Sequence, residues 1–273
     1  MRPSGGVAWI DAETRSFDYE SGAVGPAFSR AIAVEAPVQI VIGGSPFAIM
    51  MATPTDLDDF AYGFALSEGI ADRIDDIRGV EATEVEGGWR IAISLKGEQF
   101  KTHLARRRAM SGRTGCGLCG IEDFDQMPSP RPPLEASPPI DPAAIRTALA
   151  GLEDWQPLNR LTRAVHCAAW CARDGRIVAA REDVGRHNAL DKTIGALRRA
   201  GIGPDGFFVI TSRSSFEMVA KAAGFGATTL VSVSAPTSLA LESAKKFGLT
   251  LIAVARLDGA VSFGYEMTDL LKS

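Results

Sequence analysis

Short apolar runs separated by glycine pairs dominate the first hundred residues, and this pattern predicts strands rather than helices. Gly43-Gly44-Ser45 joins the first two runs as a hairpin turn, and Gly87-Gly88 joins a later pair. Residues 1–33 are weakly patterned, so we expect a partly ordered lead-in there. The predicted strands are Val38–Gly43, Pro46–Met51, Arg78–Glu84, Trp89–Leu95 and Gln99–His103.

One helix interrupts these strands. Thr55 is its expected N-cap, and Asp56 and Asp58 stand in the first turn, where the helix dipole favours acidic side chains. Gly69 is expected to end it. Its apolar stripe at helical spacing is Leu57, Phe60, Ala61, Phe64 and Ala65.

The pattern changes in the second half, where apolar strands alternate with amphipathic helices. A helix capped by Asp141-Pro142 comes first, and another is expected after Asn188. Repeated strand and helix units predict a mostly parallel sheet covered on both faces, so the fold class is α/β (α+β overall) with a layered αβα second half. The remaining predicted elements are strands Ala164–Ala172, Arg176–Ala180, Phe207–Thr211, Thr229–Ser234, Leu249–Ala255 and Val261–Phe263, and helices Phe216–Ala223 and Pro236–Phe247.

A proline-rich segment divides the two halves. Six prolines between Gln126 and Asp141 exclude helix and sheet and favour an extended linker. We therefore expect a strand-rich region at 1–125, a linker at 126–140 and an α/β cofactor-binding domain at 141–273.

Composition narrows the class of protein. Hydrophobic residues make up 46% of the chain, charged residues 23%, and the net charge is −4. Such a chain has no general attraction to nucleic acid or to anionic membranes, so any anion site must be local. No apolar run is long enough to cross a bilayer. We expect a cytoplasmic protein, in which paired cysteines serve catalysis, metal binding or redox relay rather than a structural disulfide.

The candidate reactive group is a cysteine pair in the glycine-rich stretch Arg113–Gly120. Cys116 and Cys119 stand three positions apart, and three glycines within six residues favour a loop, expected to be mobile over 111–120. Arg113 and the run Arg106–Arg108 supply positive charge, which lowers a thiol pKa and favours the nucleophilic thiolate.

Alternatives to a reactive thiol remain open. Cys116 and Cys119 could hold zinc together with His166, Cys167 or Cys171, although that spacing matches no common zinc knuckle. A thioredoxin-type pair is disfavoured because its motif opens a helix after a strand. Cys167 and Cys171 fall on one face of a predicted strand, which favours core packing.

Two loops after predicted strands form a candidate anion site. Residues 211–215 and 232–238 each follow a strand and open a helix, so free backbone N–H groups would meet at the carboxyl edge of the sheet. Ordinary helix capping by their Ser and Thr side chains is the competing interpretation. The candidate ligands are Ser212, Arg213, Ser234 and Thr237, joined by Arg186 and His187 from a further helix start.

Three long motifs resemble the FdhD family of formate dehydrogenase accessory proteins. They are Arg113–Gly120, Glu182–Lys192 and Ser234–Ala240, with further similarity at Thr53–Leu57 and Ser67–Ile70. The resemblance implies a sulfurtransferase that takes sulfur from a cysteine desulfurase as a persulfide. It would pass this sulfur to the molybdenum (or tungsten) bis(molybdopterin guanine dinucleotide) cofactor, its bound substrate, before insertion into formate dehydrogenase. No permanent cofactor or metal is expected.

The resemblance also assigns roles to residues. It implies that Cys116 carries the persulfide, that Cys119 assists, and that the protein is a homodimer with a second half like the cytidine deaminase fold. The family stretch Thr-Gly-Gly-x-His appears here as Thr162–His166. A family turn of the Pro-Gly-Arg kind is replaced by Leu257-Asp258-Gly259, which leaves Arg256 as a cation. The implied cofactor-contacting segment is Val254, Ala255, Arg256, Leu257, Asp258 and Gly259.

A competing class of function is a zinc-bound scaffold or molybdenum-cofactor chaperone that binds the guanine dinucleotide without transferring sulfur. Stoichiometric zinc that depends on Cys119 would favour that class.

Overall fold

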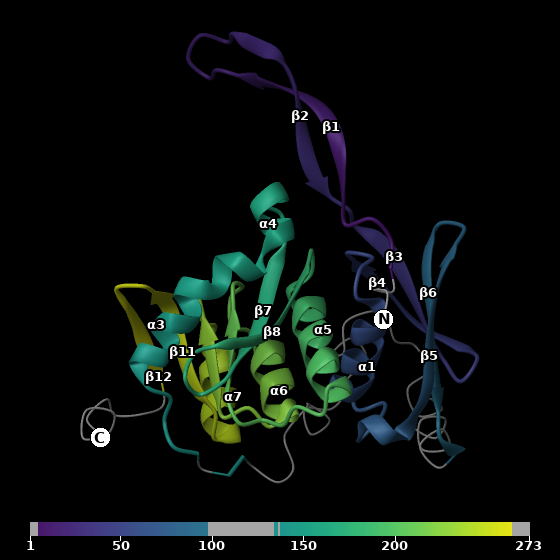
Figure 1. Cartoon of the computed structure of the whole chain (residues 1–273), viewed down its shortest axis with the longest axis vertical. Helices are drawn as coiled ribbons and strands as arrows, with labels where there is room; N and C mark the ends of the chain where they lie inside the picture. Colours follow the sequence, from purple (N-terminus) through teal and green to yellow (C-terminus); the bar gives the residue numbers. More distant parts are fainter. Residues whose placement is uncertain (1–4, 98–133, 136, 264–273) are drawn as a thin grey trace.

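Three β-sheets and the helices between them make up the part of the chain that the structure describes (Figure 1). The structure, a computed structural model, describes residues 5–97, 134–135 and 137–263. The cysteine loop with Cys116 and Cys119, the strand expected at Gln99–His103 and residues 126–133 of the linker lie outside those residues. The described end of the linker has neither helix nor strand, and Arg173 donates hydrogen bonds to the carbonyls of Pro138 and Pro139.

The first sheet is a two-stranded arm that stands away from the rest of the molecule (Figure 1). Strands β1 (Trp9–Phe17) and β2 (Val24–Ala33) pair antiparallel with one irregularity near the tip. The expectation of a partly ordered lead-in at residues 1–33 was therefore wrong. Apolar residues face both sides of this hairpin, so no single apolar stripe marks it in the sequence.

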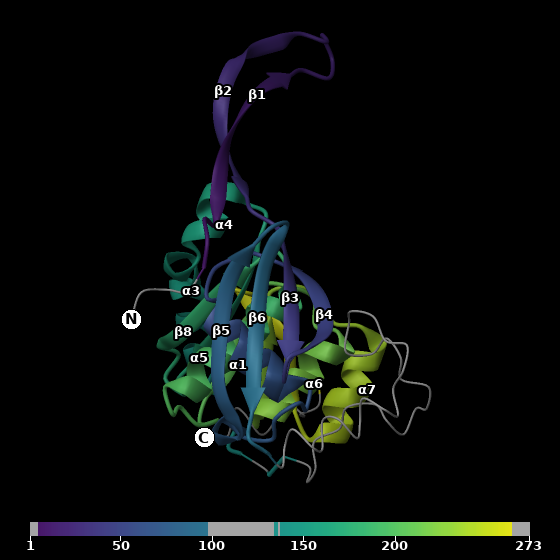
Figure 2. The ribbon, with the colours of Figure 1, turned by 90° about the vertical axis from the view of Figure 1, so that its right-hand side faces the viewer.

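The second sheet has four strands in the order β4-β3-β6-β5. They are β3 (Ala36–Ile42), β4 (Ser45–Ala52), β5 (Ile77–Val85) and β6 (Gly88–Leu95), as the apolar runs predicted. Helix α1 (Leu57–Ser67) covers one face, and Figure 2 shows the sheet in front of it. The predicted stripe of α1 is buried against β3 and β6. A short 3-10 helix, η1 (Ile74–Asp76), precedes β5.

The N-cap of α1 differs from the prediction. Asp56 rather than Thr55 occupies that position, in the left-handed region with φ 51°, and its side chain makes no capping hydrogen bond. Asp56 instead lies 3.5 Å from Arg181 Nε, so an ion pair to the second half of the chain competes with the local cap.

The third sheet has six strands in the order β12-β11-β10-β9-β7-β8. Only β9, β10 and β11 pair in parallel; β7 is antiparallel to both its neighbours, and β12 is antiparallel to β11. The β7–β8 hairpin follows the turn that Asp174-Gly175 predicts, but the expectation of a mostly parallel sheet was wrong, because β7 also pairs antiparallel with β9 and β12 with β11. The strands are β7 (His166–Cys171), β8 (Ile177–Asp183), β9 (Phe207–Ile210), β10 (Thr229–Ser232), β11 (Thr250–Arg256) and β12 (Gly259–Phe263).

Helices cover both faces of this sheet, which gives the expected αβα layers. On one face α5 (Arg186–Arg199), α6 (Phe216–Phe225) and α7 (Ser238–Phe247) pack around Trp170, Phe208 and Phe225. On the other face lies α3 (Pro142–Gly151), capped by Asp141 as predicted, followed by the 3-10 helix η3 (Leu152–Trp155) and α4 (Pro157–Thr162).

Helices α1 and α5 join the two halves at a close crossing. A Cβ atom at Gly63 would lie 1.7 Å from the carbonyl oxygen of Asp191, and one at Gly195 would lie 1.9 Å from that of Asp59. Neither helix can approach so closely with a larger residue there, because the backbones themselves would overlap. The two glycines therefore set the distance between the first and second halves.

Alanine at Gly195 should destabilise the protein by about 1–3 kcal/mol or more, because the helices must move apart. The matched control is Gly224→Ala in α6, where a Cβ meets nothing within 4 Å and the residue is exposed. That control should raise the free energy of unfolding by about 0.5–1 kcal/mol through helix propensity. Urea unfolding of both variants tests this; equal effects at the two sites would contradict a close-packed crossing.

Ion pairs also tie the halves together. Asp59 of α1 lies 2.7 Å from Arg181 and 2.5 Å from Arg199. Lys221 of α6 lies 2.8 Å from Asp191 and 2.7 Å from Glu68. These groups are largely buried, so each charge depends on its partner. Within the described part of the chain, no helix is long and apolar enough to cross a membrane.

Candidate functional site

Four strands of the six-stranded sheet end at the same edge. Strands β9, β10 and β11 are parallel to one another. Strand β8 runs in the same direction, because β8 and β9 are each antiparallel to β7. The segments that follow β8, β9 and β10 enter α5, α6 and α7, so three helix N-termini meet at this edge. Helix N-termini present free N–H groups and a positive dipole end, which suit an anionic ligand.

The loops at this edge hold one another in place. The N–H of Thr237 donates to the carbonyl of Ser214, and the N–H of Val254 donates to that of Ser234, at 3.0 and 3.1 Å. The buried Ser232 hydroxyl donates to the carbonyls of Ser212 and Ser234. The predicted loops 211–215 and 232–238 therefore form one connected surface, as expected for adjacent parallel strands.

The N-terminus of α5 is positioned by a buried carboxylate, Asp183. It accepts hydrogen bonds from the N–H groups of Gly185 and Thr53, at 2.7 and 3.0 Å, and from Asn188 Nδ2 at 3.0 Å. Lys192 Nζ lies 2.6 Å away, and both charged side chains are fully buried. This pair fixes the turn from which Arg186 and His187 project.

Titratable side chains gather beside that turn. His187 Nε2 lies 2.6 Å from a carboxylate oxygen of Glu217 on α6, and His166 at the start of β7 is near both Arg186 and His187. Burial, and next the positive charge of Arg186, lowers the pKa of His166 from 6.5, so its ring is neutral near pH 7. The close approach of the His187 ring lowers the pKa of Glu217.

The carboxylate of Glu217 should make stability depend on pH. A carboxyl group whose pKa is lower in the folded than in the unfolded chain stabilises the fold above its ordinary value of 4.5, and that contribution is lost as the pH falls through the folded value. We therefore expect Glu217→Gln to lose less stability than the wild type on going from pH 5 to pH 3. Urea unfolding at a series of pH values measures this. Parallel curves would contradict it.

Several buried polar atoms at this edge have no hydrogen-bond partner among the residues that the structure describes. Arg186 Nε and the hydroxyls of Ser214 and Ser215 are buried and make no hydrogen bond among the described residues. Ser214 is completely buried, whereas Ser215 is the N-cap of α6 without a side-chain capping bond. Unpaired buried donors are costly, so an anion that accepts from them would be stabilised.

The segment Val254–Gly259 closes this edge. Val254 has φ 52°, which is a strained conformation for a β-branched residue, and the pairing of β11 with β12 is irregular at that point. Ala255 is buried, so its side chain cannot reach a ligand; the other five residues are exposed. The guanidinium of Arg256 donates to the carbonyls of Val233 and Ala255 and therefore holds the neighbouring loop.

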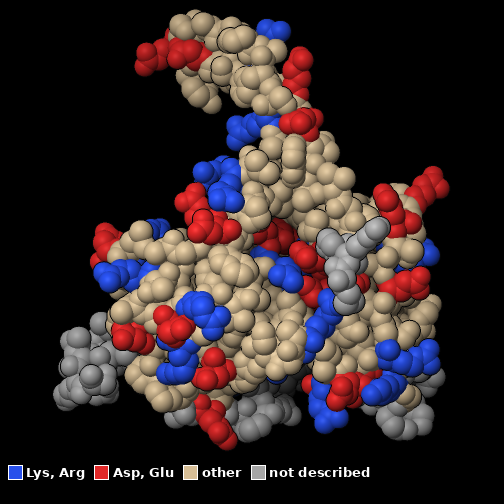
Figure 3. All heavy atoms as spheres, viewed as in Figure 1, with Lys and Arg blue, Asp and Glu red and all other residues tan. Residues whose placement is uncertain are grey.

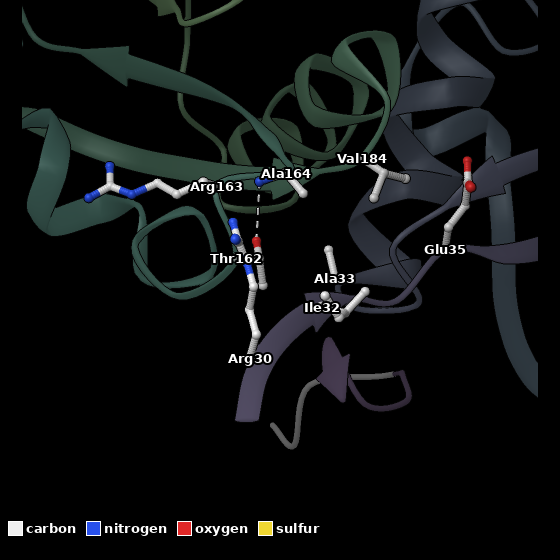
Figure 4. A pocket seen from close by; sticks show the side chains of 8 residues that line it. All are labelled: Arg30, Ile32, Ala33, Glu35, Thr162, Arg163, Ala164 and Val184. Atoms are coloured by element: carbon white, nitrogen blue, oxygen red, sulfur yellow. Dashed lines mark hydrogen bonds between the residues drawn. The ribbon is translucent and has the colours of Figure 1, made fainter. Parts of the chain in front are cut away.

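An open pocket of about 650 Å³ lies beside this edge, between α4 and the base of the arm (Figure 4). Arg163 has φ 56° and points away from the other labelled side chains. The lining contains none of the twelve predicted cofactor residues, although Val184 is close to two of them in the chain. The lining residues are Arg30, Ile32, Ala33, Glu35, Thr162, Arg163, Ala164 and Val184.

The twelve predicted cofactor residues thus lie at one edge of the six-stranded sheet, on loops, in the first turn of α5 and at the β11–β12 turn, with differing contacts. Ser212 is buried and bonds to the carbonyl of Arg213, and Thr237 caps α7 through the N–H of Ala240, so capping is observed there. Arg213 is exposed. Sequence reasoning missed the roles of Asp183, Lys192 and Glu217, although the first two lie within a quoted motif. Their pairing depends on tertiary contacts that no spacing rule indicates.

The remaining cysteines are packed in the core, as predicted. Cys167 and Cys171 are buried on one face of β7, and neither forms a disulfide. Burial raises the pKa of both thiols, that of Cys171 to about 12. Within residues 5–97, 134–135 and 137–263, no three His, Cys, Asp or Glu side chains are grouped as metal ligands.

The fold and this edge define an α/β protein with a candidate anion-binding site. The sequence model of the FdhD/NarQ family matches residues 33–266. The chain therefore belongs to the FdhD/NarQ family, as its three motifs indicated.

Relatives that are similar to this chain over most of its length share one name. A sulfur carrier protein FdhD of Variovorax paradoxus is 45% identical over 233 residues, covering 85% of this chain and 84% of that protein. One from Chromobacterium violaceum is 44% identical, covering 92% and 93% of the two chains. A crystal structure from Desulfotalea psychrophila, provisionally described as a formate dehydrogenase accessory protein, has a TM-score of 0.76. It is 24% identical and covers 95% of this chain and 98% of its own, and it supports the fold.

Proposed function

We propose that this protein is a cytoplasmic sulfurtransferase needed for formate dehydrogenase activity. It accepts sulfur from a cysteine desulfurase as a persulfide on Cys116. It then transfers that sulfur to the molybdenum (or tungsten) bis(molybdopterin guanine dinucleotide) cofactor before the catalytic subunit of formate dehydrogenase receives it. The observation that carries the proposal is the 44–46% identity with relatives named sulfur carrier protein FdhD.

We assign the thiol chemistry to Cys116 and Cys119 because the other two cysteines, Cys167 and Cys171, are buried. A thiolate attacks far better than a thiol, and the pKa values of Cys167 and Cys171 are raised by burial. The Cys116 thiolate would attack the outer sulfur of the desulfurase persulfide. The sulfur–sulfur bond of that persulfide breaks, the desulfurase thiolate leaves, and Cys116 carries the transferred sulfur. Cys119 would protect or resolve this persulfide.

The carboxyl edge of the six-stranded sheet supports binding of an anionic cofactor. Donors for phosphate oxygens are three helix N-termini, Arg186 Nε and the hydroxyls of Ser214 and Ser215. These three side-chain groups have no partner in the described part of the chain. His187 lies in the first turn of α5, and Arg213 lies on the loop between β9 and α6. The guanine dinucleotide of the cofactor carries its negative charge on a pyrophosphate, which such donors recognise.

Intact mass of the full chain tests the sulfur step. After incubation with a cysteine desulfurase and free cysteine, the wild type should gain the mass of sulfur, and a reducing agent should remove it. GDP serves as the probe of the cofactor site, and Arg186→Met should weaken its binding at least tenfold while leaving the sulfur gain unchanged. No sulfur gain, with stoichiometric zinc in the purified protein, would instead support a zinc-bound scaffold or cofactor chaperone.

A further inference from the structure

The pocket between α4 and the base of the β1–β2 arm takes no part in the sulfur transfer proposed above. Its volume of about 650 Å³ falls in the range of pockets that hold nucleotide-sized ligands. Thr162 is the last residue of α4, and Val184 directly follows β8, so the pocket opens beside the turn into α5. Arg186, whose Nε has no partner among the described residues, stands two positions after Val184. The pocket therefore lies next to the candidate anion site.

Opposite charges stand at the two ends of this pocket. Figure 4 shows Arg30 directed towards Thr162 at one end and Glu35 at the other end. Five residues of extended chain, at about 3.3 Å each, separate the two backbones by up to roughly 16 Å, about the length of a nucleoside diphosphate. Neither charged side chain forms a hydrogen bond or an ion pair with another described residue. Both are therefore available to a ligand.

The lining between these two ends is apolar. Ile32 and Ala33 come from the arm, and Val184 comes from the start of the turn into α5. Such side chains pack well against the faces of a flat ring. The pocket thus suits a ligand with hydrogen-bond donors at one end, a flat ring beside them and negative charge at the other end.

The carboxylate of Glu35 indicates which ring. A carboxylate accepts two hydrogen bonds side by side. Guanine offers two adjacent donors, N1–H and its exocyclic amino group. Adenine places its amino group next to an acceptor nitrogen, which the second carboxylate oxygen repels. A carboxylate also repels phosphate, so the diphosphate of such a ligand belongs at the end near Arg30.

The surface around the pocket does not supply this recognition. Figure 3 shows basic and acidic side chains interspersed over the face that it displays, and the net charge of the chain is −4. Such a surface has no general attraction for an anion. Arg163 also lines the pocket but points away from the other labelled side chains (Figure 4). Recognition therefore depends on Arg30, Glu35 and the apolar lining.

We propose that this pocket binds a guanine base of the cofactor and that Glu35 selects guanine over adenine. The Glu35 carboxylate accepts from N1–H and from the amino group, and the diphosphate lies between Arg30 and Arg186 at the start of α5. This inference rests on the proposed function, which supplies the guanine dinucleotide as the ligand. Glu35 is then a specificity-determining residue outside the thiol chemistry.

Calorimetric titration of the full chain with GDP and with ADP tests the role of Glu35. The wild type should bind GDP at least about tenfold more tightly than ADP. Glu35→Gln should remove or reverse this preference, because an amide offers one acceptor beside one donor, which is the pattern that pairs with adenine. The matched control is Glu81→Gln, which removes an exposed carboxylate on β5 outside the pocket and should keep the preference.

Arg30→Met separates the diphosphate from the base. It should weaken GDP and ADP by the same factor, because the two nucleotides share the diphosphate, and it should leave their ratio unchanged. A changed ratio in this variant would contradict the placement of the diphosphate near Arg30. Circular dichroism of each variant checks that it is folded.

The outcomes separate this inference from the proposed function. If Arg186→Met weakens GDP binding but Glu35→Gln keeps the wild-type preference over ADP, the guanine pocket is overturned and the anion site remains. A wild type that binds no GDP would overturn the guanine pocket together with the proposed cofactor site. The sulfur gain of the wild type, measured by intact mass, tests the sulfur step by itself.

Discussion

Alanine in place of Cys116 should abolish persulfide formation by a cysteine desulfurase, whereas alanine in place of Cys167 should leave it intact. Cys167 is buried in the apolar cluster of the six-stranded sheet, and burial raises its thiol pKa. It therefore offers neither access nor thiolate to another protein's persulfide. Cys116 stands among glycines and arginines in the sequence. The glycines favour access to the thiol, and the arginines favour its thiolate form.

The measurement is the intact mass of each variant after the same incubation with desulfurase and cysteine. Cys167→Ala is the matched control because it removes a thiol from the same chain at a site without access. Sulfur retained by Cys116→Ala would show that this residue is not the carrier and would move the assignment to Cys119. Persulfide lost in both variants would contradict the argument from burial.

Methionine at Lys192 should lower the free energy of unfolding by about 3–5 kcal/mol. Lys192 and Asp183 are fully buried, 2.6 Å apart, and Lys192 also donates to the carbonyl of Thr53 at 2.8 Å. Without the ammonium group, Asp183 would remain as an uncompensated charge in the core. Because Asp183 also orients Gly185 and Asn188, the start of α5 should lose its fixed geometry.

Two further variants separate the buried charge from the loss of a side chain. Replacing both partners, as Lys192→Met with Asp183→Asn, should restore part of the loss because no lone charge stays buried. Arg160→Met, which removes an exposed pairing with Asp154 at 3.9 Å, should cost less than about 1 kcal/mol. Urea unfolding compares all three variants. A Lys192→Met effect as small as that of Arg160→Met would refute the structural role of the buried pair.

Local pattern predicted most of the elements that the structure contains. The strands of the four-stranded sheet, helix α1 and the helices of the second half follow apolar periodicity, glycine turns and the Asp141-Pro142 cap, all of which act over a few residues. The arm escaped prediction because its apolar residues face both sides and cover no core of their own. Sheet order escaped prediction as well, because which strands become neighbours outside the hairpins depends on contacts between distant segments of the chain.

The chain by itself determined the family, through three motifs, and the types of residue that could carry sulfur and bind an anion. It also determined that Cys167 and Cys171 share one face of a strand. Only the tertiary structure placed the loops after β8, β9 and β10 at one edge and left Arg186 Nε and the Ser214 hydroxyl without partners among the described residues. It alone joined Asp183 and Lys192 to Thr53, which lies 130 and 139 residues away from them in the chain. The physical reason is that burial and charge pairing depend on the close approach of distant segments, which local sequence does not encode.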